Sequence, residues 1–202
     1  MMPAARESLL DAAFTALTRR PWSAVRMVDV AAAAGVSRQT LYNEFGSKDG
    51  LARALVRREA DGYLAGVERA LAAHAEPHER LTATAEWTAS AARDNALVRA
   101  MLTGCWSERL PAPTLSGVPS SSAVPAQRRA DGPLPSPGDL LRIVRDRAVT
   151  ALSAPGAAPA EVAELAFCCE LVARIALSCV AVPPGAGGMA GLIGGALRGR
   201  QP

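Results

Sequence analysis

The sequence predicts an all-α fold. Half of its 202 residues are hydrophobic while only 4% are aromatic, and alanine is abundant, a composition that suits closely packed helices. Apolar residues recur at the three-to-four-residue spacing of helices, and no segment shows the sustained alternation of β-branched residues that marks strands. A chain of this length can hold a small domain and a larger one in a single compact body.

An amphipathic helix is predicted first, over residues 4–18. Its apolar side contains Leu9, Leu10, Ala13, Phe14 and Leu17. Residues 21–23 break this helix, and we expect Trp22 and Val25 to cover its core.

Two short helices joined by a tight turn are predicted over residues 27–48. One face of the first helix carries small apolar side chains: Val28, Val30, Ala31 and Ala34. Gly35 stands where the chain must turn sharply, which predicts a positive φ that glycine adopts without steric cost. Ser37 is placed to cap the second helix, because its hydroxyl can accept a bond from the free N–H groups at the helix start.

The second of these helices is anchored by Leu41 and Phe45, which lie four residues apart on one face. The other face is polar and is expected to project outward, with Arg38, Gln39, Thr40, Tyr42 and Asn43. A helix of this size with hydrogen-bonding side chains fits the major groove of DNA. The stretch therefore predicts a helix-turn-helix that binds double-stranded DNA.

The longer string A-G-V-S-R-Q-T-L-Y-N-E-F-G-S-K-D-G-L, residues 34–51, closely resembles the DNA-binding domain of the tetracycline-repressor (TetR) family of bacterial regulators. The resemblance covers roughly the first quarter of the chain. It implies a three-helix DNA-binding domain over residues 1–48, in which the first helix packs across the other two. Residues 49–202 would form a helical ligand-binding and dimerisation domain, reached through the long helix that Ser47 opens.

The expected DNA contacts divide into base and phosphate contacts. Gln39 has the geometry to bind an adenine edge and Arg38 a guanine edge. Thr40 and Tyr42 suit phosphates or thymine methyl groups, and Asn43 suits either a base or a phosphate. The remaining expected contacts lie at helix starts, where backbone N–H groups also favour phosphate: Arg26, Ser37 and Lys48.

The charge distribution agrees with an anionic partner at the N-terminal end. The formal net charge is +3, and residues 1–58 hold nine basic and five acidic side chains. A local excess of positive charge favours nucleic acid as the partner of this part of the chain.

Six further helices are predicted: 48–73, 78–93, 95–106, 139–152, 159–182 and 189–198. Gly62 and Gly66 lie inside the long first one and indicate either the close approach of another helix or a bend. Ser136 or Asp139 is expected to cap the helix that ends at Leu152.

Residues 107–138 differ in composition, being rich in proline and serine without a helical period. They predict a long disordered loop that DNA binding does not need, with a functional binding loop as the alternative.

A homodimer is predicted from the last two helices. Residues 159–182 carry two apolar stripes, one from Val162 to Val180 and one with Phe167, Leu171, Ile175, Ser178 and Cys179. A helix that is apolar on two sides must be covered on both. Glycines recur every four residues at Gly187, Gly191 and Gly195, which favours very close helix packing at an interface; a frayed tail is the alternative.

Together these features predict a homodimeric, ligand-responsive repressor that a small hydrophobic effector releases from a palindromic operator. The resemblance implies a population shift: the effector favours a dimer whose recognition helices are wrongly spaced for DNA. Candidate ligand contacts are Trp87, Met101, Cys105, Trp106 and Phe167, which could equally be core.

Other function classes are weighed against this one. An effector-independent architectural DNA-binding protein is the main alternative. An enzyme is not expected, because the sequence offers no nucleophile–base arrangement or metal-ligand cluster, and no cofactor or metal is predicted. Thiol sensing by Cys168 and Cys169 is a further option. The absence of a signal peptide or of a long apolar run indicates a cytoplasmic protein without a membrane partner.

Overall fold

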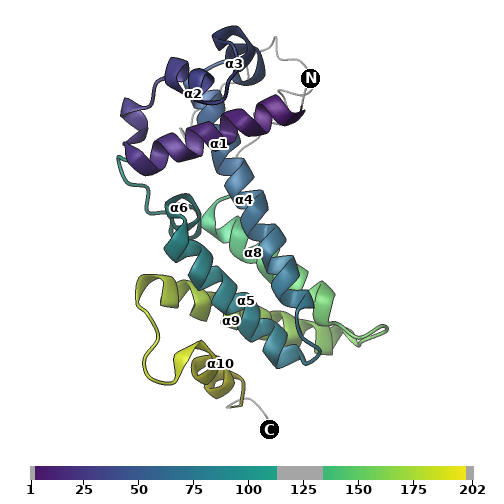
Figure 1. Ribbon diagram of the computed structural model, residues 1–202. Coiled ribbons are helices and arrows are strands. Elements are labelled where there is room, and N and C mark those ends of the chain that lie inside the picture. The colour runs from purple at the N-terminus through teal and green to yellow at the C-terminus, as the bar shows by residue number, and fades with distance from the viewer. Residues whose placement is uncertain (1–2, 113–133, 199–202) are drawn as a thin grey trace. The chain divides into compact units, whose positions relative to one another are not determined.

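The computed structural model describes residues 3–112 and 134–198, and over those residues it is all-helical, as predicted (Figure 1). The chain divides into two compact units. Unit 1 comprises Met1–Glu59 with Trp106–Leu134, and unit 2 comprises Ala60–Cys105 with Pro135–Pro202. None of the described helices is long and apolar enough to cross a membrane.

Unit 1 is built from α1 (Pro3–Arg19), the short 3-10 helix η1 (Trp22–Ala24), α2 (Met27–Ala33), α3 (Arg38–Phe45) and the first part of α4 (Lys48–Ala72). Helix α1 crosses the α2–α3 pair (Figure 1). The buried side chains include Leu9, Leu10, Trp22, Val25, Val30, Leu41, Phe45 and Leu51. This core confirms the predicted three-helix packing and the role of Trp22 and Val25.

The prediction that Val28 lies on the apolar face of α2 is wrong. Val28 was placed on the apolar face, but its side chain is 50% exposed. The buried residues of this short helix are Met27, Val30 and Ala31, which lie three and four residues apart. Val28 falls between these positions and points away from the core.

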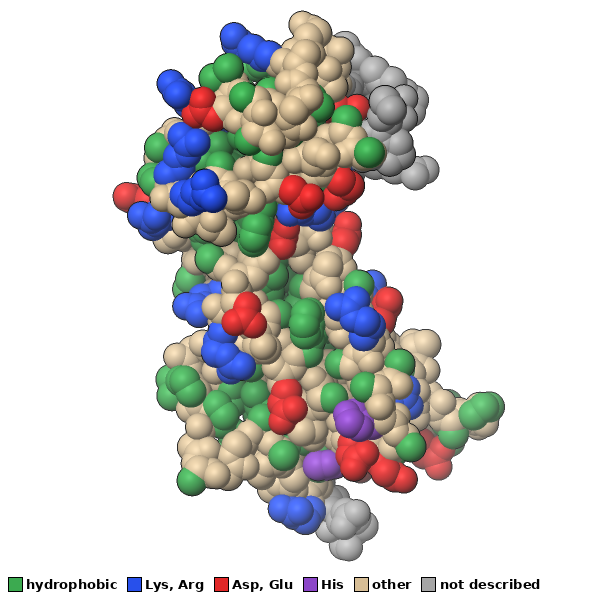
Figure 2. All heavy atoms as spheres, in the orientation of Figure 1, with side chains coloured by type: hydrophobic (Ala, Val, Ile, Leu, Met, Phe, Trp, Pro, Cys, Tyr) green, Lys and Arg blue, Asp and Glu red, His purple; other side chains and the backbone are tan. Residues whose placement is uncertain are grey.

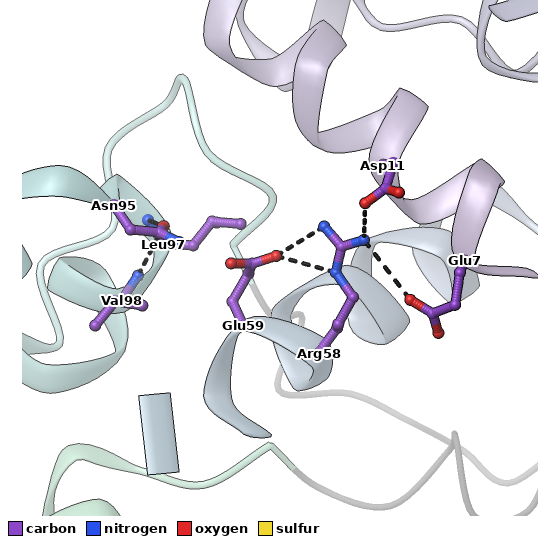
Figure 3. A network of polar contacts seen from close by, with 7 residues as sticks. All are labelled: Glu7, Asp11, Arg58, Glu59, Asn95, Leu97 and Val98. Atoms are coloured by element: carbon purple, nitrogen blue, oxygen red, sulfur yellow. Dashed lines mark hydrogen bonds and ion pairs between the residues drawn. The ribbon is translucent and has the colours of Figure 1, made fainter. Parts of the chain in front are cut away.

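Arg58 ties α4 to α1 within unit 1 (Figure 3). Its guanidinium Nη1 donates to Asp11 Oδ1 at 2.6 Å, and its Nη2 donates to Glu59 Oε1 at 2.9 Å. Glu7 Oε2 lies 3.9 Å from the same guanidinium. Since Arg58 is only about one-quarter exposed, at 23%, these bonds help to fix the part of α4 that belongs to unit 1 against α1.

Unit 2 contains the rest of α4 together with α5 (Pro77–Asp94), α6 (Ala96–Thr103), α8 (Pro137–Leu152), α9 (Pro159–Ala181) and α10 (Gly188–Arg198). Helix α9 packs against both α5 and α8, and α10 packs against α5 and α9 (Figure 1). The core of unit 2 is almost entirely aliphatic and includes Val67, Leu81, Leu97, Leu140, Val144, Val172 and Ile193.

Gly66 allows α5 to approach α4 closely, as one of the two sequence alternatives predicted. A Cβ built on Gly66 would collide with the Trp87 indole, whose Nε1 donates to the Tyr63 carbonyl at 3.0 Å. Gly62 differs, because a Cβ there would meet no atom within 4 Å. Only Gly66 is therefore required by helix packing.

Helix α6 is shorter than predicted. Asn95 caps its start by accepting bonds from the N–H groups of Leu97 and Val98. The helix ends at Thr103 because Gly104 adopts φ +74° and its N–H donates to Ala100 O. Cys105 and Trp106, predicted to lie in the helix, follow this end instead.

The predicted loop over 107–138 is ordered at both of its described ends, which corrects the sequence assignment there. Arg109 O accepts a 2.8 Å hydrogen bond from Trp22 N, and Pro111 is buried. At the other end, Ser136 and Asp139 form a capping box that starts α8 at Pro137. Residues 113–133, including Arg128 and Arg129, lie outside the described residues.

Candidate nucleic-acid interface and internal pocket

The turn between α2 and α3 has the predicted geometry. Gly35 adopts φ +68°, and its N–H donates to Ala32 O at 3.2 Å. Val36 N donates to Ala31 O at 3.1 Å, which closes the turn. Leu41 and Phe45 are buried, so the orientation of α3 is set from below by its apolar side.

Ser37 caps α3 as predicted, and Thr40 takes part in the same cap. Ser37 Oγ accepts from Thr40 N at 3.0 Å and lies 2.8 Å from Thr40 Oγ1. Thr40 is only half-exposed. Its hydroxyl is thus engaged at the helix start, which fixes the first turn of α3.

The outer face of α3 carries a preorganised polar pair. Gln39 Nε2 donates to Asn43 Oδ1 at 2.8 Å, and both residues are exposed. A primary amide has two N–H donors, so Gln39 keeps one N–H and its carbonyl oxygen for an outside partner. These are the two groups that a bidentate contact to adenine N7 and N6 requires.

Arg38 and Tyr42 form a second pair beside the first. The Arg38 guanidinium carbon lies 5.3 Å from the centre of the Tyr42 ring, within the range of a cation–π contact. Arg38 is exposed and Tyr42 is half-buried. The ring therefore supports a guanidinium that can reach outward.

Arg26 stands at the N-cap of α2 with a side chain that is 72% exposed. Its Nε and Nη2 donate to the two oxygens of Asp29 at 3.0 and 3.1 Å, and Arg20 Nη1 donates to the same carboxylate at 3.1 Å. These hydrogen bonds lower the pKa of Asp29 below its ordinary value, and the bonds from Arg26 contribute most. Asp29 thus holds Arg26 in one orientation at the protein surface.

Lys48 is held at the start of α4. Its Nζ donates to Ser23 O at 3.1 Å and lies 5.6 Å from the centre of the Trp22 ring. Glu44, the acidic residue of α3, lies 3.9 Å from the guanidinium of Arg6. This pairing offsets a negative charge that would repel a phosphate. Figure 2 shows several basic side chains on the visible face of this unit.

Unit 2 contains an apolar pocket with very little free space. Residues of α4, α5, α6, α8 and α9 line it, mostly with Leu, Val and Ala side chains, and the free volume is about 20 Å³. A single water needs roughly 10–15 Å³ by this measure. No charged side chain occurs among the described residues that line it. The pocket suits an uncharged apolar molecule, provided that the helices move apart to admit it.

A chain of hydroxyl groups forms the polar part of the pocket wall. Tyr63 Oη lies 3.1 Å from Thr88 Oγ1, which in turn donates to Thr84 O at 2.9 Å. Thr84 Oγ1 donates to Arg80 O at 2.8 Å. Burial raises the pKa of Tyr63 to about 12, so the phenol is neutral at physiological pH.

The five predicted ligand contacts are absent from the described lining of this pocket. Trp87 packs on Gly66, Met101 is in the core, Cys105 is exposed, Trp106 belongs to unit 1, and Phe167 is 52% exposed. Tyr63, Thr84 and Thr88 line the pocket and were not predicted from the sequence. Their signal is the four-residue spacing of two threonines on the apolar face of α5, which marks hydroxyls that face a core.

The cysteines and histidines do not form a reactive cluster in the described part of the chain. Burial raises the pKa of the Cys169 thiol to about 11, which keeps it protonated and unreactive. His74 Nδ1 lies 3.7 Å from a Glu79 oxygen. Among the described residues, no group of three or more His, Cys, Asp or Glu side chains is placed to hold a metal ion.

The outward faces of α9 and α10 carry exposed apolar residues. Phe167 on α9 is 52% exposed, Val182 just after α9 is 71% exposed, and Leu192 on α10 is 47% exposed. Gly191 and Gly195 are also exposed, and a Cβ on either would meet no atom within 4 Å. Apolar side chains are visible on this unit in Figure 2. Helix α9 buries Cys169, Val172, Ala176 and Cys179 on its opposite side, which places Cys179 in the core rather than in the second predicted stripe.

Comparison with known proteins places the N-terminal part in a family. The sequence model of the bacterial regulatory proteins of the tetR family matches residues 9–55. The chain is 51% identical over 69 residues to the HTH-type transcriptional regulator AlkX of Mycobacterium tuberculosis, covering 34% of this chain and 33% of that one. It is 37% identical over 81 residues to the transcriptional activator FasR of Mycolicibacterium smegmatis, covering 40% and 37%.

Two solved structures share the fold over most of the chain. The TetR-family repressor AlkX from a Dietzia strain, implicated in biodegradation of n-alkanes, has a TM-score of 0.51 and 24% identity, covering 95% of this chain and 92% of that one. PfmR of Thermus thermophilus has a TM-score of 0.50 and 20% identity, covering 96% and 99%.

The chain spans between one-third and one-half of the length of the curated relatives it matches. These relatives are transcriptional regulators rather than enzymes. Residues 9–55, which contain the helix-turn-helix, thus match the tetR family of bacterial regulatory proteins, and the described residues share the all-helical fold of the TetR-family structures.

Proposed function

We propose that the protein is a homodimeric, ligand-responsive transcriptional regulator that reads a palindromic DNA operator with α3. The observation that carries this proposal is the outer face of α3, where Gln39 and Asn43 form a fixed polar pair above a buried apolar anchor. In this proposal residues 1–48 bind DNA, and residues 49–202 bind the ligand and the second subunit.

The assignment of DNA contacts follows from the accessible groups. Gln39 and Arg38 read base edges, while Tyr42 and Asn43 contact bases or phosphates. Arg26 and Lys48 contact phosphates, where they add affinity without sequence preference. Ser37 and Thr40 support these contacts mainly by fixing the first turn of α3, since their hydroxyls bond to each other.

Dimerisation is supported by the exposed side of α9 and α10. Val182 and Leu192 expose apolar surface there, and the bare backbone at Gly191 and Gly195 permits a second helix to approach closely. Covering such a surface gains roughly 25 cal/mol for each Å² removed from water. A two-fold dimer places two copies of α3 one helical turn of DNA apart or a multiple of it, which matches a palindrome.

An uncharged apolar effector is supported by the aliphatic pocket of unit 2. The relationship to AlkX proteins, one of which is implicated in the biodegradation of n-alkanes, agrees with a hydrocarbon-derived molecule. The relatives include both a repressor and an activator. We favour a repressor that acts in the bacterial cytoplasm and is released when the effector opens the pocket.

An effector-independent DNA-binding protein is the second candidate, and the small free volume of the pocket favours it. A genome-wide map of the bound DNA, followed by binding assays with the purified protein and n-octane, 1-octanol or octanoate, separates the two candidates. The main proposal expects at least one of these molecules to lower operator affinity. Unchanged affinity with all three supports the effector-independent alternative.

A further inference from the structure

The pocket of unit 2 offers a hydrogen-bond acceptor rather than a donor, and this follows from counting hydrogens. Thr88 has one hydroxyl hydrogen, which it donates to the Thr84 carbonyl. In its 3.1 Å contact with Tyr63, Thr88 Oγ1 must therefore be the acceptor and Tyr63 Oη the donor. The Tyr63 hydrogen is then used within the protein, while its oxygen lone pairs are left to accept.

The other hydroxyl of the wall has the same polarity. Thr84 donates its single hydrogen to the Arg80 carbonyl. All three hydroxyl hydrogens among Tyr63, Thr84 and Thr88 are thus directed at protein atoms. A ligand reaching this wall finds oxygen acceptors, which suit a molecule that brings its own O–H.

The uncharged character of the described lining residues restricts the class of ligand further. No basic side chain occurs among the described residues that line the pocket, so a carboxylate would enter without a counter-ion at a large desolvation cost. No acidic side chain is present among them either, which disfavours a protonated amine for the same reason. The neutral state of Tyr63 maintains this selectivity at physiological pH.

We infer that the effector class of this pocket is an aliphatic alcohol, with its chain among the Leu, Val and Ala side chains and its hydroxyl donating to the oxygen of Tyr63. This inference rests on the proposed ligand response and adds to it the chemical class of the ligand. The free volume of about 20 Å³ means that the alcohol must separate the lining helices on entry. Binding and structural change are consequently coupled.

The test measures binding of 1-octanol, n-octane and octanoate to the full chain by calorimetry and thermal shift. We expect 1-octanol to bind at least about fivefold more tightly than octane, the worth of one hydrogen bond of about 1 kcal/mol, and octanoate more weakly than both. Tyr63→Phe should remove the advantage of the alcohol and leave octane unchanged. Thr150→Val, which removes from α8 a hydroxyl outside the described lining of this pocket, is the matched control and should leave all three affinities unchanged.

A second variant reverses the polarity of the wall. Thr88→Val keeps the shape of the side chain but removes the acceptor of the Tyr63 hydrogen, so Tyr63 can donate to a ligand. The variant should then gain affinity for 2-octanone, a pure acceptor, relative to 1-octanol. Tighter binding of octanoate than of 1-octanol by the wild-type chain, equal binding of alcohol and alkane, or no binding of any of them would overturn the inference.

Operator binding in the absence of ligand, measured in parallel, distinguishes this inference from the proposed function. If the chain binds an operator but prefers octane or octanoate, the alcohol assignment fails and the regulator proposal stands. If it binds no specific DNA, the regulator proposal fails. The ligand affinities still show in that case whether the pocket prefers an alcohol.

Discussion

Gln39 donates a 2.8 Å hydrogen bond to Asn43 across one turn of α3, so that two exposed amides share one fixed arrangement. A free glutamine side chain loses rotamer entropy when it binds a base, at a cost of up to about 2 kcal/mol. Because the bond to Asn43 already restricts the Gln39 side chain, part of this rotamer entropy is lost before DNA binds. In the proposed function Asn43 is therefore both a DNA contact and a support for Gln39.

Replacing Gln39 by alanine should weaken operator binding by about 1–3 kcal/mol and relax the preference at one base pair in each half-site. Asn43→Ala should cost less and should broaden the same preference, because Gln39 remains but is no longer held. Binding to a panel of single-base operator variants measures both effects. An unchanged base preference in the Gln39 variant excludes this residue from base readout.

Lys48→Ala should weaken binding to all DNA sequences alike and lower the slope of log affinity against log salt by about one. The same variant loses the bond from Nζ to Ser23 O, so the melting temperature should fall slightly. Measurement of the salt slope on operator and on unrelated DNA checks this role. A loss confined to the operator would instead make Lys48 a sequence-reading residue.

Gly66→Ala should destabilise the protein by about 1–3 kcal/mol, since the new Cβ collides with the Trp87 indole in a packed contact. Gly62→Ala is the matched control in the same helix and has open space at its Cβ. It should stabilise the protein by about 0.5–1 kcal/mol, because alanine favours the helix. Urea unfolding of both variants gives the comparison, and equal effects would contradict the close approach at Gly66.

Acid should weaken unit 1 through Asp29. The bonds from Arg26 and Arg20 lower its pKa in the folded state, so its contribution to stability is present above the unfolded value of about 4 and is lost as pH falls through the folded value. Asp29→Asn should reduce this dependence below pH 4 and also free Arg26. Thermal melts between pH 3 and 7 test it, and an unchanged acid dependence in the variant would remove Asp29 from the account.

In the segment after α6, we expect the residues next to the helix to stabilise unit 1 and the later residues to have little effect on operator binding. Removing Leu115–Pro133 is expected from composition to leave operator affinity nearly unchanged, because loop entropy varies slowly with length. Pro111→Ala should lower the stability of unit 1, since Pro111 is buried beside the Arg109 bond to Trp22. Limited proteolysis and operator binding of both variants provide the measurements. If the deletion variant remained folded and dimeric but lost specific DNA binding, residues 115–133 would belong to the DNA-binding machinery.

The sequence predicted features that depend on local chemistry. The cap at Ser37, the positive φ at Gly35 and the buried pair Leu41 and Phe45 follow from residue type and spacing alone. The end of α6 was misplaced although its signal was present, because Gly104 stops the helix before Cys105.

The pocket was beyond sequence reasoning for a different reason. Its wall combines Tyr63 with Thr84 and Thr88 on another helix, and only the packing of α4 against α5 brings them together. Aromatic residues such as Trp87 and Phe167 were better candidates by size. Trp87 is instead used to pack on Gly66, which depends on a pairing that helical periodicity does not reveal.

In the proposed function two copies of α3 read the two halves of one operator. The most direct measurement selects DNA that binds the purified full chain from a random pool, with Gln39→Ala and the interface variant Gly191→Leu in parallel, and determines mass in solution. We expect the wild-type chain to be a dimer that enriches an inverted repeat. Gln39→Ala should lose one base preference in each half, and Gly191→Leu should be a monomer without palindromic selection. A wild-type monomer, or an enriched sequence without two-fold symmetry that Gln39→Ala leaves unchanged, would contradict it.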